Sequence, residues 1–174
     1  MEEFSTRAQR IKLIAFDVDG VMTDGSLYLG DDGQEYKAFN SLDGHGMKML
    51  KRSGVERAII TGRTSKVVAQ RAANLGITYL YQGIEDKLVA WQELLAKLGL
   101  TPEECAFMGD DVVDLPAMRR SGLAISVPAA AAAVRQYAHY VTNLGGGHGA
   151  VREACEAIMR AQGTLDAQLA PYLK

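Results

Sequence analysis

Two aspartates, Asp17 and Asp19, stand one residue apart directly after the apolar run of residues 11–16. Such a run is typical of a buried parallel strand, and ligands bind just beyond the carboxyl ends of these strands. Gly20 lets the chain turn, which could bring both carboxylates to one site where they could hold a hard cation. The alternative is a loop with two solvated acids, because aspartates near turns are common.

Two further apolar strands also end in polar residues. Residues 58–60 lead into Thr61, Gly62 and Arg63, and residues 105–108 lead into Gly109, Asp110, Asp111 and, a turn later, Asp114. Lys87 opens a predicted helix between them. In a parallel sheet these strand ends lie along one edge, so the polar residues are expected to meet.

The charge of this set indicates a cation. Asp17, Asp19, Asp110, Asp111 and Asp114 carry up to −5, and Lys87 returns only +1. Such clustering is unfavourable in a partly dry site unless a cation is present. A hard divalent ion with oxygen ligands fits, and Mg²⁺ is the usual ion beside a phosphate. We therefore expect a magnesium site that completes its shell with a phosphate ester.

Strands alternate with helices of about ten residues along the chain, which predicts an α/β fold. The sheet should be Rossmann-like and mostly parallel, with helices on both faces and a β-hairpin at about 21–40 after the first strand. The remaining strands are expected at 58–60, 78–81, 105–108, 123–127 and 140–141. Helices are expected at 41–53, capped by Ser41 or Asp43, and at 65–75, 87–98, 114–120, 129–137 and 150–162. Residues 145–149 should form a flexible loop, and 164–174 a tail.

The composition indicates one soluble globular domain spanning residues 1–174, with 48% hydrophobic and 23% charged residues. A net charge of −2 gives no sign of nucleic acid or an anionic membrane as partner. The acidic residues 1–4 do not resemble a secretory signal, and no apolar run approaches the ~20 residues that span a bilayer. Cys105 and Cys155 form no close metal-type pair, which fits a reducing cytoplasm.

Taken together, these motifs resemble the phosphatases of the haloacid dehalogenase superfamily. The superfamily's pattern is a DxD loop, a Thr or Ser, a Lys and an acidic pair at successive strand ends. Asp17 and Asp19, Thr61, Lys87, and Asp110 with Asp114 supply it in the same order, between residues 11 and 114.

The resemblance implies a role for each residue. Asp17 would be the nucleophile that forms an aspartyl-phosphate, and Asp19 the general acid and then the base. The Asp17 carboxylate, the Asp19 backbone carbonyl and Asp110 would hold Mg²⁺. Thr61 and Lys87 would bind the transferring phosphoryl group, while Asp111 and Asp114 would orient the metal shell or Lys87.

A closer resemblance is to the family of 3-deoxy-D-manno-octulosonate 8-phosphate phosphatases, from about residue 12 to 163. It is carried by 17–25, 37–40, 43–46, 59–63, 80–83, 109–111, 145–147 and 149–153. The resemblance implies a cytoplasmic homotetramer that makes a sugar acid for lipopolysaccharide. Relatives of this family act on nine-carbon sialic-type sugar acids, so the phosphate of such an acid is the alternative substrate. His148 stands where an Arg is expected, and residues 128–134 replace a more polar segment, with consequences for specificity.

The gaps between the motifs are too short for a cap domain over the site. Residues 20–60 hold the hairpin, one helix and one strand, and residues 62–86 hold one helix and one strand. Phosphoryl transfer benefits from excluding water, so we expect a neighbouring subunit to close the site with its hairpin. An open monomer is the alternative, although an unprotected hairpin edge is itself a pairing surface.

The substrate's carboxylate needs a partner, and Arg63 and Arg71 are candidates because arginine pairs bidentately with such groups. Surface solvation or an ion pair between subunits is the alternative for both. His45, between two glycines, could line the site or serve only in a turn. Gly62 belongs to the same predicted binding loop. A phospho-accepting receiver domain is a rival function, but Asp19 two residues after Asp17 argues against it.

Overall fold

The computed structural model describes residues 2–174. The strands are β1 Leu13–Phe16, β2 Tyr28–Leu29, β3 Glu35–Tyr36, β4 Glu56–Ile60, β5 Tyr79–Tyr81, β6 Cys105–Met108, β7 Leu123–Ser126 and β8 Tyr140–Val141. The α-helices are α1 Glu2–Ala8, α2 Ser41–Arg52, α3 Lys66–Leu75, α4 Lys87–Leu98, α5 Leu115–Met118, α6 Ala132–Tyr137, α7 Ala150–Ala161 and α8 Leu165–Leu169. Short 3-10 helices are η1 Pro102–Glu104, η2 Val112–Asp114 and η3 Ala170–Tyr172.

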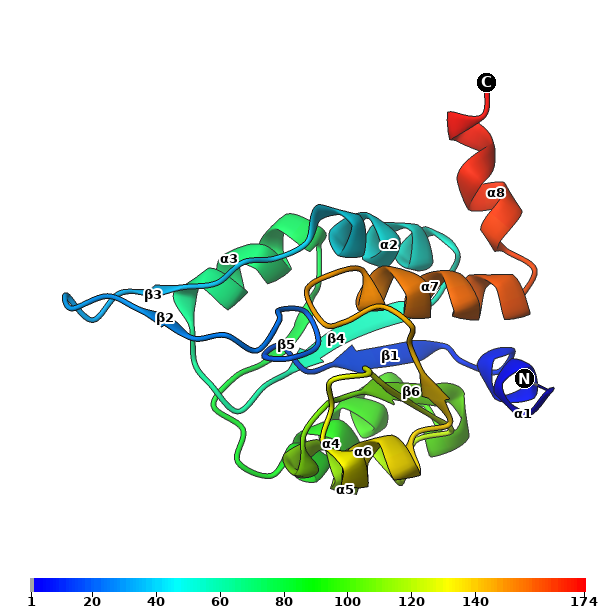
Figure 1. The fold of residues 1–174 in the computed structure, drawn as a ribbon. Helices are drawn as coiled ribbons and strands as arrows, with labels where there is room; N and C mark the ends of the chain where they lie inside the picture. Colours follow the sequence, from blue (N-terminus) through cyan, green and yellow to red (C-terminus); the bar gives the residue numbers. More distant parts are fainter. Residues whose placement is uncertain (1) are drawn as a thin grey trace.

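The main sheet has six strands in the order β5-β4-β1-β6-β7-β8, and every neighbouring pair is parallel. In Figure 1, α2, α3 and α7 cover one face, and α4, α5 and α6 cover the other. Strands covered on both faces must be apolar throughout, and all residues of β1, β6 and β7 are buried. The predicted α/β fold is therefore confirmed.

Chain order reverses at β1, which lies between β4 and β6. Counted along the chain, the six strands lie in the order 3-2-1-4-5-6, which differs from the 2-1-3-4-5 order of receiver-like folds. The receiver alternative is therefore wrong. Phe16 pairs with both Ile59 and Met108, so the ends of β1, β4 and β6 lie level. The crevice beyond them is where ligands of such sheets bind.

The predicted hairpin is present but has only two residues in each strand, and β2 pairs with β3 away from the main sheet. Figure 1 shows it as a long arm extending from the body of the protein. Only this arm lies between β1 and α2, and only α3 lies between β4 and β5. No cap domain interrupts residues 2–174, as predicted.

Several local predictions need correction. The N-cap of α2 is Asn40, whose side chain accepts hydrogen bonds from the backbone of Leu42 and Asp43, rather than Ser41 or Asp43. The helix expected at 129–137 begins at Ala132, where the turn after β7 ends. The glycine loop is held in place: Gly147 N donates to Val21 O at 3.1 Å. The predicted tail at 164–174 is largely helical, because α8 and η3 lie within it. The N-terminal helix α1 was not predicted.

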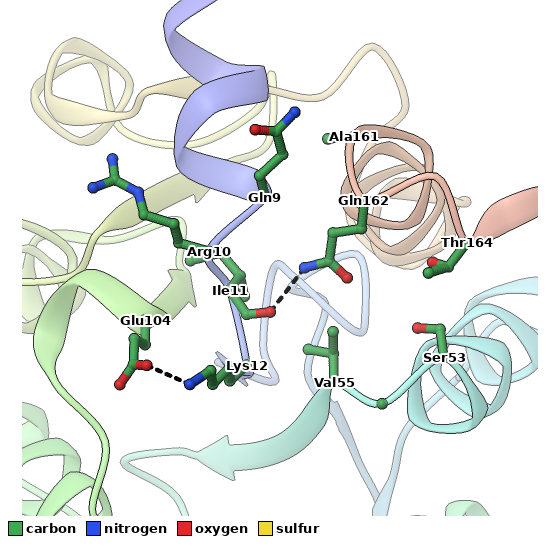
Figure 2. A pocket seen from close by; sticks show the side chains of 11 residues that line it. Gln9, Arg10, Ile11, Lys12, Ser53, Val55, Glu104, Ala161, Gln162 and Thr164 are labelled. Atoms are coloured by element: carbon green, nitrogen blue, oxygen red, sulfur yellow. Dashed lines mark hydrogen bonds and ion pairs between the residues drawn. The ribbon is translucent and has the colours of Figure 1, made fainter.

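The amino ends of the strands form a second, separate surface. A cavity of about 650 Å³ lies there. Among its lining residues, Lys12 pairs with Glu104 at 2.6 Å and Gln162 donates to Ile11 O at 2.8 Å (Figure 2). None of the sequence motifs reaches it. Among the helices of residues 2–174, none has the length and apolar character that crossing a bilayer requires.

Candidate active site

Asp17 and Lys87 form the centre of the site. Asp17 directly follows β1, and Lys87 is the first residue of α4, where Asp86 caps the helix. Both side chains are buried, with Lys87 Nζ 2.7 Å from Asp17 Oδ1. This ion pair holds the Asp17 carboxylate beside the first residue of α4.

Asp114 fixes the position of Lys87. Its Oδ1 accepts a hydrogen bond from Lys87 Nζ at 2.5 Å. Its Oδ2 accepts from the backbone N–H groups of Asp110 at 3.0 Å and Asp111 at 3.2 Å. A Cβ on Gly109 would lie 2.5–2.6 Å from Asp114 atoms, so only glycine leaves room for this fully buried carboxylate. Asp114 therefore positions both the lysine and the loop after β6.

Asp110 supplies the third carboxylate, from the loop after β6. Oxygens of Asp17, Asp110 and Asp114 lie within 4.8 Å of one another. Asp110 Oδ1 is buried without a hydrogen-bond partner. A Cβ on Gly20 would lie 2.0 Å from Asp110 Oδ2, so this glycine makes room for the carboxylate. An unpartnered buried oxygen among carboxylates fits the ligand set of a hard divalent cation.

The pKa values reflect this crowding. Burial, and then the charge of Asp114, raises the pKa of Asp17 to about 6 despite the opposing effect of Lys87. Burial and the charge of Asp17 raise the pKa of Asp110 to about 7. Both carboxylates are therefore costly to ionise together, and a bound cation would remove that cost.

Asp19 faces different partners. Its carboxylate forms an ion pair with Lys37 and lies 3.8 Å from Arg63 Nε. Glu35 Oε1 lies 3.1 Å from both Lys37 Nζ and Arg63 NH2, which completes the network. The cluster of carboxylate oxygens thus contains Asp114 and not the Asp19 side chain, and a metal contact through the Asp19 backbone carbonyl stays a prediction.

These groups surround a cavity of about 490 Å³ at the strand ends. Its lining consists of Asp17, Asp19, Gly25, Leu27, Thr61, Gly62, Arg63, Ile84, Glu85, Lys87, Asp110, Asp111 and Val113. Thr61 is buried directly after β4, where its backbone N–H donates to Tyr81 O at 2.9 Å. The structure therefore brings the predicted Thr61, Gly62 and Arg63 to the same pocket as the carboxylates.

Two residues expected in this pocket lie elsewhere in the subunit. Arg71 donates to Asn40 O at 3.0 Å and lies 5.7 Å from the ring centre of Phe39. His45 lies on α2, where its ring meets that of Tyr172 edge to face at 5.4 Å. Their positions on α3 and α2 turn both away from the lining, so a single subunit gives them no contact with a ligand there.

Sequence reasoning gave no role to Lys37 and Glu35. Lys37 belongs to the segment 37–40 that carries the family resemblance, which was the available signal. Only the folded hairpin shows that its ammonium group, 1% exposed, reaches Asp19. His148 is exposed and lies outside the pocket lining.

Comparison with known proteins adds independent findings. A family profile for haloacid dehalogenase-like hydrolases matches residues 28–122. The 3-deoxy-D-manno-octulosonate 8-phosphate phosphatase of Salmonella typhi is 48% identical over 92% of this chain and 86% of its own. The Escherichia coli K12 phosphatase of the same name is 49% identical over 92% and 85%.

Solved structures agree with these sequence matches. A probable YrbI family phosphatase from Pseudomonas syringae superposes with a TM-score of 0.99 at 52% identity, covering 100% of this chain and 99% of its own. The Moraxella catarrhalis 3-deoxy-D-manno-octulosonate 8-phosphate phosphatase, solved with magnesium, phosphate and a KDO molecule, gives 0.97 at 46% identity, covering 99% of each chain.

Proposed function

The chain belongs to the haloacid dehalogenase-like hydrolases, as a phosphomonoester hydrolase of the 3-deoxy-D-manno-octulosonate 8-phosphate phosphatase family, and we propose from this premise that it hydrolyses that sugar-acid phosphate with Mg²⁺. The products are the free sugar acid and phosphate, and the reaction belongs to lipopolysaccharide precursor synthesis in the cytoplasm. The observation that carries the proposal is the buried Asp17–Lys87–Asp114 arrangement beside Asp110.

The metal fits the residues present. Asp17, Asp110 and the backbone carbonyl of Asp19 would hold Mg²⁺, with Asp114 fixing the loop that carries Asp110. When bound, the ion neutralises charge on the phosphate and on the carboxylates. The magnesium in the Moraxella catarrhalis structure supports this assignment.

Asp17 serves as the nucleophile. Its carboxylate oxygen attacks phosphorus, forming an aspartyl-phosphate while the bond between phosphorus and the sugar oxygen breaks. Lys87, held by Asp114, and Thr61 stabilise the charge on the phosphoryl oxygens. Asp19 gives its proton to the departing sugar oxygen.

The second half of the reaction regenerates the enzyme. Asp19 takes a proton from water, the water oxygen attacks phosphorus, and the bond to Asp17 breaks to release phosphate. Gly62 and Arg63, which line the cavity, are placed to contact the substrate. Arg71 and His45 could contact a substrate only if the assembly of subunits brings them to the active site of a neighbouring subunit.

We also propose that the enzyme is a homotetramer in which the neighbouring hairpin closes the site. Four apolar side chains of the arm are exposed: Leu27, Tyr28, Leu29 and Tyr36. An exposed apolar strand pair is unstable in water as a monomer and pairs readily. No cap shields the cavity within residues 2–174, so a partner's arm would exclude water from it.

The testing experiment measures phosphate release from a panel of sugar phosphates, with Mg²⁺ and with EDTA. The eight-carbon sugar acid is expected to be preferred over the nine-carbon acids, and EDTA to abolish turnover. Asp17→Asn should lower kcat by at least about 10³-fold, whereas Asp166→Asn, an exposed residue of α8, should not. Preference for a nine-carbon acid would overturn the proposed substrate assignment. Full activity in Asp17→Asn would overturn the covalent mechanism.

A further inference from the structure

A second cavity, of about 490 Å³, lies on the outer side of α2 and shares no lining residue with the candidate active site. It is bounded by α2, the start of β4, the end of α3 and the C-terminal η3, which meets α2 where the rings of Tyr172 and His45 touch. Its polar lining consists of His45, Lys48, Lys51, Arg52, Arg57 and Tyr172. No carboxylate lines it, in contrast to the acidic site at the strand ends.

Arg57 forms the buried part of this cavity and is only 1% exposed. Its terminal nitrogens donate to Leu75 O at 3.0 Å, Gly76 O at 3.0 Å and Met47 O at 3.3 Å. Its Nε is buried without a hydrogen-bond partner. Within residues 2–174, Arg57 makes no ion pair with a carboxylate, and the nearest negative charge that acts on it is that of Glu56.

The cations around Arg57 are also largely unpaired. Lys51 pairs with Glu56, but neither Lys48 nor Arg52 makes an ion pair in the part of the chain that the structure describes. Burial and the charges of Arg152, Arg52 and Lys48 hold the pKa of His45 below its usual range, as expected of a positive potential. The cavity is therefore a basic pocket whose lining includes the buried Arg57.

We propose that this basic pocket binds the phosphate group of a small molecule, either free inorganic phosphate or a phosphate monoester. A phosphate dianion offers acceptor oxygens in several directions, which suits donors arriving from α2, β4 and the C-terminal segment. Within residues 2–174, Tyr172 donates no hydrogen bond, and its hydroxyl accepts one from Arg52 at 3.4 Å. Its O–H is thus a further donor toward an anion.

The test uses the full chain in EDTA and follows the ring proton resonances of His45 by NMR, assigned with His45→Gln. Inorganic phosphate and glycerol phosphate are titrated separately, with acetate as a carboxylate control. We expect a saturable shift of His45 with one or both phosphates, while His148 and His139 stay unchanged. A response to one phosphate alone identifies the ligand source, and no saturable shift with either overturns the proposal.

Variants separate the pocket from adventitious charge effects. Arg57→Met removes the buried donor, and Lys48→Gln with Arg52→Gln removes exposed cations without disturbing the core. Each change should weaken phosphate binding by about tenfold or more, whereas Arg120→Gln, exposed after α5, should leave it unchanged. The proposal would be overturned if the Lys48/Arg52 double variant bound phosphate as tightly as the wild type. It would also be overturned if the wild type bound acetate as tightly as phosphate. The catalytic proposal does not depend on either result.

Discussion

Lys37, from the hairpin arm, forms an ion pair with Asp19, the proposed general acid and base in the loop after β1. The two residues are 18 positions apart, and the lysine ammonium is almost fully buried. The arm is therefore tied to the reaction centre of its own subunit as well as being available to a neighbour. This relationship links the hairpin to the loop that carries Asp19.

Removing this ion pair should reduce turnover. Lys37→Met leaves Asp19 with only the more distant Arg63, so the carboxylate loses its fixed orientation. A hydrogen bond to a charged group contributes about 1.5–3 kcal/mol, so kcat should fall by roughly tenfold to a hundredfold. Steady-state kinetics on the preferred sugar phosphate would measure it. Lys12→Met, which breaks a lysine–glutamate pair at the opposite end of the sheet, is the matched control (Figure 2).

Gly20→Ala should weaken the metal site. The added Cβ would lie 2.0 Å from Asp110 Oδ2, and the φ of +92° is unfavourable for alanine. Asp110 must then move, and the Mg²⁺ concentration for half-maximal activity should rise by at least about tenfold. Gly163→Ala, at φ +68° with no atom near the new Cβ, tests the backbone strain alone. An unchanged Mg²⁺ requirement in Gly20→Ala would contradict the assignment of Asp110.

The metal-free protein should become less stable as pH rises from about 4 to about 7. The pKa values of about 6 for Asp17 and about 7 for Asp110 exceed the ordinary 3.8, so the folded state holds protons that the unfolded chain releases. Thermal unfolding in EDTA should therefore show a falling Tm across this window, and Mg²⁺ should raise Tm most at high pH. Asp110→Asn should flatten the trend; a variant with the full wild-type slope would refute this explanation.

The exposed arm should determine the oligomeric state. Leu29 is 68% exposed at the end of β2, and Leu29→Asp would place a charge in the proposed contact between subunits. Native mass spectrometry should show four chains in the wild type and smaller species in the variant, with reduced activity because the site loses its cover. Val89→Asp changes an equally apolar, 59% exposed residue of α4 and should remain tetrameric. A monomeric wild type would rule out the closure by a neighbour.

The strands that position the site were predictable because their signals are local. Residues 13–16, 105–108 and 58–60 are continuous apolar runs, and a parallel strand buried on both faces requires them. Polar residues at the ends of three such strands meet at one edge by the rules of parallel sheets. The convergence of Asp17, Thr61 and Asp110 therefore followed from the sequence.

The partners of those residues depended on how the loops run. Lys87 meets Asp114 across 27 positions, and Asn40 Nδ2 reaches Gly147 O across 107. A Cβ on Gly146 would lie 1.9 Å from Gly20 O, so the glycine loop predicted to be flexible packs directly on the loop after β1. No periodicity encodes these contacts.

The same reason explains why two predicted substrate-binding residues lie outside the pocket of their own subunit. Arg71 and His45 lie near the motifs in sequence, but side-chain direction on α3 and α2 sends them to Asn40 and to Tyr172. The sequence by itself determined the strands, their polar ends and the charge that calls for a cation. The tertiary structure alone decided which side chains meet there, because long-range packing sets the path of each loop and the face of each helix.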